Sequence, residues 1–342
     1  MPSIPGFLSR YLTKEQPKPP PPITTGTAAV LLVVYTLLYV VPFYLSPTTR
    51  PSRTLSRDAP TVIRARVASV SLTCAVCSLI TFLILTTSSP GGATTSQALH
   101  SLGYWPLGLV DAVRCLALTA VLFAGPLFET LIVHGAWRHW LSLAPVSVLF
   151  AEWTVWRNIV AGPFTEEVLF RSASVPLMLV AQTSVSRTIF LSPVIFGLAH
   201  VHHFYEFRLS HPHIPAATGV LRSAVQFSYT SLFGAYATFL FLRSGSLLAI
   251  CVVHAFCNVM GLPRFWGRVG PGLGDDAYDD DDDDDDDDAG AGRRGGEAKG
   301  GTTPSIWWTV VYYVLLVGGA VGWYKNLGTL TESGNALVPV EI

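Results

Sequence analysis

The chain has 342 residues, of which 50% are hydrophobic and only 13% are charged, and its mean hydropathy is +0.44. This composition is typical of a polytopic membrane protein and argues against a soluble domain. Twelve of the 23 acidic residues lie between Asp275 and Asp288, which leaves 11 acids against 22 basic residues in the rest of the chain. In a membrane protein such an excess is typical of cytosolic loops, and we find no signature of nucleic-acid binding.

The predicted elements begin with a flexible, proline-rich tail over residues 1–23. A transmembrane catalytic bundle is expected over residues 24–263, and its first two apolar runs, 28–45 and 67–86, are long enough to cross a bilayer. The loop between these runs, residues 46–66, contains five arginines and one acid. The positive-inside rule therefore places this loop on the cytosolic side of the membrane.

Apolar segments continue through the rest of the bundle. Residues 107–133 contain the third span, and Glu129 inside it is expected to be a buried partner for a basic group elsewhere. Residues 141–160 contain Glu152 and Arg157, so an interfacial or partly embedded helix is expected there. Later apolar segments are expected at 163–181, 191–204, 219–242, 247–262 and 305–325. The sequence therefore predicts an all-α, polytopic membrane helix bundle of about eight transmembrane helices.

Residues 264–304 separate the last two predicted spans and contain ten consecutive aspartates, Asp279 to Asp288. A run of like charges repels itself and buries no apolar surface, so a disordered Asp- and Gly-rich loop is expected. A solvated insertion is the simpler interpretation of this loop, and a collector of cations or basic substrates is the alternative. Residues 326–342 are expected to form a tail after the last helix.

Two adjacent carboxylates, Glu166 and Glu167, lie in the apolar stretch that starts at Gly162. Pro163 suits the first turn of a helix, so a helix is expected to begin there with both acids near its N-terminus. Glu167 and Arg171 are four residues apart and are expected to form an ion pair on one helix face. Glu166 points about 100° away, which leaves it available for general acid–base catalysis. The simpler interpretation of the two acids is a charged first turn at the membrane surface.

Three further polar side chains lie in later apolar segments. His200 ends one apolar run, His254 lies within another, and Asn258 follows His254 by four residues on the same helix face. A single histidine in an apolar helix is usually structural, but a glutamate, two histidines and an asparagine on three embedded helices indicate a catalytic site. His202 and His203 approach a polar loop and are weaker candidates that are expected to face solvent.

These residues form three short motifs. Residues 166–171 read EEVLFR, residues 196–200 read FGLAH, and residues 254–258 read HAFCN. In this order they match the EExxxR, FxxxH and HxxxN motifs, so the sequence resembles the CPBP (CAAX protease and bacteriocin-processing, or ABI) family of intramembrane glutamate proteases. The phrases GPFTEE and FGLAHVHH resemble the type II CAAX prenyl endopeptidases within that family. The resemblance is strongest over residues 140–265.

The resemblance implies a multi-pass protease of the endoplasmic reticulum membrane, with a membrane-embedded active site that is open to the cytosol. Such a protease removes the last three residues from prenylated CAAX proteins such as small GTPases, and it needs no cofactor. The implied partners are these proteins and the membrane lipid. Embedding suits the substrate, because a lipid chain gains about 0.8 kcal/mol for each CH₂ group that it buries.

Hydrolysis of an amide needs an activated water, a stabilised oxyanion and a proton for the leaving amine. In this interpretation Glu166 is the general base and His200 orients or polarises the water. His254 and Asn258 donate hydrogen bonds to the oxyanion, and Arg171 supports the site by fixing Glu167.

Two alternatives remain open from the sequence. A zinc-dependent metalloprotease could act on the same substrates with His200, His254 and Glu166 as ligands, although the sequence contains no HExxH motif. A non-enzymatic membrane scaffold or transporter could use the same polar residues as a structural network or a proton path.

Overall fold

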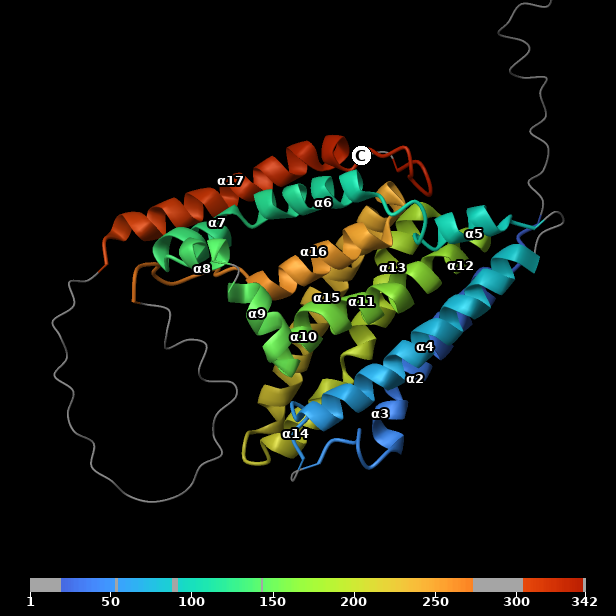
Figure 1. Ribbon diagram of the computed structural model, residues 1–342, viewed down its shortest axis with the longest axis horizontal. Coiled ribbons are helices and arrows are strands. Elements are labelled where there is room, and N and C mark those ends of the chain that lie inside the picture. The colour runs from blue at the N-terminus through green and yellow to red at the C-terminus, as the bar shows by residue number, and fades with distance from the viewer. Residues whose placement is uncertain (1–19, 53–54, 88–91, 143, 273–303, 341–342) are drawn as a thin grey trace, which may run out of the picture.

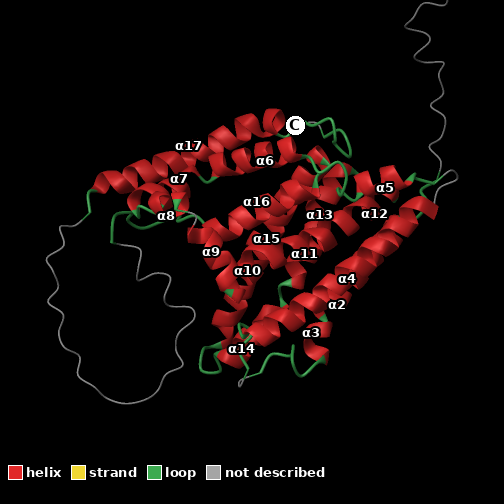
Figure 2. Ribbon diagram, in the orientation of Figure 1, coloured by secondary structure: helices red, strands yellow, loops and turns green. Residues whose placement is uncertain are grey.

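The computed structural model describes residues 20–52, 55–87, 92–142, 144–272 and 304–340. Within these residues the regular structure consists of helices, without a strand (Figure 2). The all-α class expected from the sequence is therefore confirmed. Residues 1–19 of the predicted tail, and residues 273–303 of the predicted Asp- and Gly-rich loop, lie outside the described residues.

The helices are joined by connections of different lengths, of which the stretch between α16 and α17 is the longest. In chain order they are α2 (Thr25–Val40), α3 (Pro42–Leu45), α4 (Pro60–Thr87), α5 (Thr95–Ser101), α6 (Leu109–Leu122), α7 (Ala124–Leu127), α8 (Trp137–Leu141), α9 (Ala144–Ala151), α10 (Trp153–Trp156), α11 (Gly162–Glu167), α12 (Val175–Val180), α13 (Val185–Ala199), α14 (His202–Ser210), α15 (Ala216–Ser244), α16 (Leu247–Met260) and α17 (Ile306–Leu330). Three π-helical segments join them, namely η1 (Phe128–Val133), η2 (Arg157–Ala161) and η3 (Val168–Ala173).

Several of these helices are long and apolar enough to cross a membrane. Among the described residues, three segments meet this condition. They are Thr25–Leu45, which comprises α2 and α3, the helix α4, and the helix α17. A fourth candidate is the pair Leu109–Leu122 and Ala124–Val133, which bends by 82° at its break. These helices agree with the membrane class that the composition predicts, and the number of about eight spans stays a prediction.

The helices surround the segment that carries the two glutamates. α17 and α6 lie side by side along one edge of the molecule, and α2 and α4 lie together along the opposite edge (Figure 1). Between these edges, α13 packs along α15, and α11 contacts both α16 and α4. This arrangement places α11 in the interior of the bundle.

Local sequence explains several helix ends. The Thr24 hydroxyl accepts a hydrogen bond from the Thr27 N–H at 3.0 Å, and the Ser246 hydroxyl accepts one from the Ala249 N–H at 3.1 Å, so both residues are N-caps. Gly245 has φ +56° in the turn that joins α15 to α16, a left-handed conformation that glycine adopts without steric cost. This tight turn lets α16 pack back against α15 and brings His254 into the interior.

The helix around the glutamate pair does not begin at Pro163, so that prediction is wrong. The backbone is helical without interruption from Trp153 to Ala173, through α10, η2, α11 and η3. Proline inside a helix lacks an N–H, and its ring clashes with the carbonyl four residues earlier. The wider π-helical turn of η2 directly before Pro163 accommodates the ring. Glu166 and Glu167 therefore lie in the middle of a helical segment rather than in its first turn.

Two further groups of contacts join the loop after α16 to η1 and the C-terminal residues to α15. Glu129 has the expected basic partner, since its Oε1 accepts a hydrogen bond from Nε of Arg264 and lies 3.1 Å from Nη2, although the two side chains are half-buried rather than buried. α17 ends at Leu330 rather than near residue 325. The segment after it folds back onto α15, where Arg243 donates hydrogen bonds to the Gly328 and Val340 carbonyls at 2.9 and 3.1 Å.

Candidate active site

Glu167 is fully buried and contacts two basic side chains. Its Oε1 accepts a hydrogen bond from Arg171 Nη1 at 3.0 Å and lies 2.7 Å from His254 Nδ1. Arg171 is also buried, and its guanidinium lies over the Phe196 ring, 4.4 Å from the ring centre. The expected ion pair between Glu167 and Arg171 is confirmed. The structure adds His254 as a second partner of the same carboxylate.

The contact with Glu167 fixes the orientation of His254. An ionised carboxylate only accepts hydrogen bonds, so His254 Nδ1 carries a proton and donates a hydrogen bond to Glu167. The other ring nitrogen, Nε2, lies 3.8 Å from Oε2 of Glu166. His254 therefore lies between the two neighbouring carboxylates.

Glu166 borders a cavity of about 240 Å³ that His200 and Asn258 also line. Its side chain is 22% exposed, whereas that of Glu167 is 0% exposed. Successive residues of a helix point about 100° apart, so one carboxylate reaches the cavity and the other is enclosed by protein. The sequence predicted this division of the two acids.

His200 and Asn258 reach the cavity from two different helices. His200 Nδ1 lies 2.8 Å from the Phe196 carbonyl oxygen and donates to it, so Nε2 of the neutral ring is an acceptor. The Asn258 amide donates to the Asn158 carbonyl at 2.8 Å and carries a second N–H on the same nitrogen. Three of the four predicted catalytic side chains thus line one cavity, and His254 contacts the cavity residue Glu166.

Sequence reasoning missed a group of basic side chains that line the same cavity. These are Arg57, Arg66, Arg157, His202 and His203. The two histidines were expected to face solvent; instead they are half-buried and line the cavity from the start of α14. The arginines come from the loop before α4, from α4 itself and from η2. Arg57 and Arg66 belong to the arginine-rich stretch 46–66, but in the sequence that stretch indicated only membrane topology.

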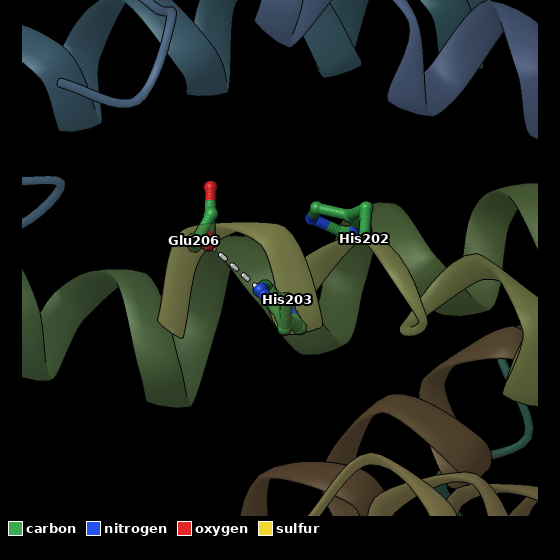
Figure 3. Close-up of side chains that lie close together, drawn as sticks. All are labelled: His202, His203 and Glu206. Carbon is green, nitrogen blue, oxygen red and sulfur yellow. Dashed lines mark hydrogen bonds and ion pairs between the residues drawn. The ribbon is translucent and has the colours of Figure 1, made fainter. Parts of the chain in front are cut away.

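His202, His203 and Glu206 lie on one turn at the start of α14, as Figure 3 shows. His203 Nδ1 lies 2.8 Å from Glu206 Oε2 and donates to it. Burial alone would raise the pKa of Glu206, but the hydrogen bond from His203 and the charges of His203 and Arg66 outweigh burial and lower the pKa to about 2. Glu206 is therefore ionised at neutral pH and binds the basic groups around it.

A metal ion fits this site poorly. Within the described ranges, the set whose ligand atoms lie within 4.8 Å of one another is His202, His203 and Glu206. The alternative zinc ligands expected from the sequence, His200, His254 and Glu166, are not brought together in this way. Glu206 already pairs with Arg66 Nη2 at 2.9 Å, and a guanidinium at this position repels a cation.

The three motifs also lie within a region that is similar to a known protein family. Residues 148–260 match a family model described as "Type II CAAX prenyl endopeptidase Rce1-like". All three motifs fall inside these residues.

Curated relatives extend the similarity over more of the chain. The chain is 40% identical over 236 residues to the probable CAAX prenyl protease 2 of Schizosaccharomyces pombe, which covers 69% of this chain and 81% of that protein. It is 42% identical over 143 residues to CAAX prenyl protease 2 of Arabidopsis thaliana, covering 41% and 45% of the two chains. The corresponding Homo sapiens protein is 35% identical over 223 residues, with 61% and 64% covered. No solved structure shows significant similarity to the chain. The motifs, the family model and these relatives agree, and the chain belongs to the type II CAAX prenyl endopeptidase family.

Proposed function

We propose that this CAAX prenyl endopeptidase removes the last three residues of prenylated proteins with a water molecule that Glu166 and His200 activate. The observation that carries this mechanism is the cavity shared by Glu166, His200 and Asn258, with His254 held against Glu166. Family membership argues against the non-enzymatic scaffold or transporter.

The first step needs a base and an orienting group on either side of the water. The Glu166 carboxylate takes one proton of the water, while Nε2 of His200 accepts a hydrogen bond from the other O–H. The water oxygen then attacks the carbonyl carbon of the scissile amide. When the C–N bond breaks, the protonated Glu166 returns the proton to the leaving nitrogen. The products are a new carboxylate on the prenylated protein and a free tripeptide.

The second requirement is stabilisation of the negative oxygen that forms on the attacked carbonyl. The second N–H of the Asn258 amide supplies one hydrogen bond, and His254 supplies another from Nε2. Because Nδ1–H of His254 is already donated to Glu167, only the doubly protonated ring carries a proton on Nε2. In this mechanism the Glu167 carboxylate therefore acts as the counter-ion of a His254 imidazolium.

The substrates proposed are prenylated CAAX proteins, with small GTPases among them. The apolar, membrane-facing helices allow the prenyl chain to remain in the lipid while the peptide end enters the cavity. We place the enzyme in the endoplasmic reticulum membrane with the cavity open to the cytosol. Arg57 and Arg66 support this orientation, because they line the cavity and belong to the arginine-rich loop that the positive-inside rule assigns to the cytosol.

The test is release of the tripeptide from a farnesylated CAAX peptide by the full chain purified in detergent. We expect cleavage by the wild type, with and without a strong chelator, and a loss of at least about 100-fold in Glu166→Ala, because a general base contributes about 10²–10⁴-fold. Glu129→Gln is the matched control, since Glu129 pairs with Arg264 and does not line the cavity. Thermal unfolding of each variant verifies that it is folded.

Two outcomes would change the assignment. Cleavage that the chelator abolishes and zinc restores would move the site to the metalloprotease alternative. Full activity in a folded Glu166→Ala protein would show that Glu166 is not the base.

A further inference from the structure

Two of the three arginines that line the active-site cavity have close carboxylate partners. Arg66 donates Nε and Nη2 to the Thr49 carbonyl at 3.0 and 2.9 Å, and Nη2 also lies 2.9 Å from Oε1 of Glu206. Arg157 Nη1 donates to Oδ1 of Asp58 at 2.6 Å. These two arginines are therefore held in place by the protein itself.

Arg57 is paired more weakly than Arg66 and Arg157. Its Nη1 lies 3.6 Å from Glu206, and its Nε lies 3.9 Å from Asp58, both beyond hydrogen-bond distance. Its side chain is 46% exposed, against 14% for Arg66 and 25% for Arg157. Since each of the two acids has a closer partner, Arg57 brings a positive charge to the cavity that these ion pairs do not balance.

We propose that Arg57 binds the free C-terminal carboxylate of the CAAX substrate. The inference rests on the proposed function, because only a protease that cuts near a C-terminus brings that carboxylate and the scissile bond into one cavity. A guanidinium suits this ligand, since its planar N–H groups match the two oxygens of a carboxylate. A partly exposed side chain also retains the freedom to turn towards an incoming peptide.

The charges of the cavity orient the peptide within it. Glu166 is an anionic base at one part of the lining and repels the substrate carboxylate, whereas Arg57 attracts it. Three extended residues span about 10 Å, so a carboxylate bound at one place in the lining holds the scissile bond at a fixed distance from it. Binding of the carboxylate by Arg57 thus sets the cleaved bond three residues from the C-terminus, and the enzyme is specific for release of a tripeptide.

The experiment compares two farnesylated peptides of one sequence, one ending in a free acid and the other in an amide. For the wild type in detergent we expect kcat/KM to be about tenfold or more higher for the acid, as for other charge-assisted hydrogen bonds. In Arg57→Gln the ratio of acid to amide is expected to fall towards one, and in Arg57→Glu to fall below one. Arg64→Gln is the control, because Arg64 is exposed on α4 and does not line the cavity; it should keep the wild-type ratio.

The outcomes separate this inference from the proposed function. If the wild type cleaves neither peptide, the proposed function fails and the carboxylate site fails with it. If the wild type cleaves the free-acid peptide and the amidated peptide equally well, the enzyme is a protease that does not bind the C-terminal carboxylate. A folded Arg57→Gln protein that keeps the full preference for the acid would exclude Arg57 as the binding residue. The wild-type comparison stands even if a variant is unstable.

Discussion

At the scale of single residues, the two adjacent glutamates have different surroundings, and we expect them to have different roles. Glu166 borders the cavity, while Glu167 is enclosed and shared between Arg171 and His254. Removing one partner of a buried ion pair leaves an uncompensated charge, which costs about 3–5 kcal/mol. We therefore predict that Glu167 is a positioning residue that also stabilises the fold, and these two contributions can be measured apart.

We predict that Glu167→Gln lowers both stability and turnover. The free energy of unfolding should fall by about 3–5 kcal/mol, because the Arg171 charge becomes buried without a counter-ion. kcat should fall while KM changes little. Without the Glu167 carboxylate, the His254 imidazolium is less well stabilised, and His254 acts on the negative oxygen that develops only in the transition state. Thermal unfolding and steady-state cleavage of a farnesylated peptide measure the two effects.

The double variant Glu167→Gln/Arg171→Met separates the two contributions. It removes both charges, so much of the lost stability should return. kcat should remain low, since the carboxylate beside His254 is still missing. Recovery of kcat together with stability would mean that Glu167 acts on the fold alone.

At the scale of elements, the spacing of residues in the sequence predicted contacts within one helix correctly. It failed where the helix departs from regular α-helical geometry. The four-residue spacing of Glu167 and Arg171 was sufficient to predict their contact. The start of a helix at Pro163 was a statistical preference, and the π-helical turn η2 overrides it by making room for the ring. No local sequence pattern predicts such a π-helical turn, because the turn depends on how the flanking helices pack.

The contact between α13 and α15 gives a second prediction at this scale. A Cβ atom on Gly234 would lie 2.7 Å from the Cβ of Pro193 and 3.0 Å from Nη2 of Arg171. We expect Gly234→Ala to lower the free energy of unfolding by about 1–3 kcal/mol, the usual cost of overpacking. Cleavage should fall as well, because the same shift displaces Arg171 and the Glu167 that it binds. Thermal unfolding and peptide cleavage measure both effects.

Gly318 provides the matched control within another helix. A Cβ atom there meets no other atom within 4 Å, and alanine is favoured over glycine inside a helix by about 0.5–1 kcal/mol. Gly318→Ala should therefore leave stability unchanged or slightly increased. Equal destabilisation by both substitutions would contradict the close approach of α13 and α15.

At the scale of the whole molecule, the contacts that sequence could not predict are those between distant segments. Glu167 and His254 are 87 residues apart in the chain, and their motifs indicated a shared site without indicating which atoms meet. Arg57 and His203 join this site only because the loop before α4 and the start of α14 fold onto one cavity. The membrane class, in contrast, follows from composition, which needs no knowledge of packing.

The orientation of the molecule in the membrane yields the last prediction. α4 has 28 residues and is about 42 Å long at 1.5 Å per residue, which exceeds the hydrocarbon core of about 30 Å, so we expect its two ends to lie on opposite sides of the membrane. In sealed, cytosolic-side-out vesicles, a membrane-impermeant maleimide should label Arg50→Cys directly and Ser96→Cys only after detergent is added, since both positions are exposed. Wild type gives the background, because its cysteines are buried or half-buried. The reverse pattern would place the cavity, with Arg57 and Glu166, on the luminal side, where cytosolic CAAX proteins could not reach it.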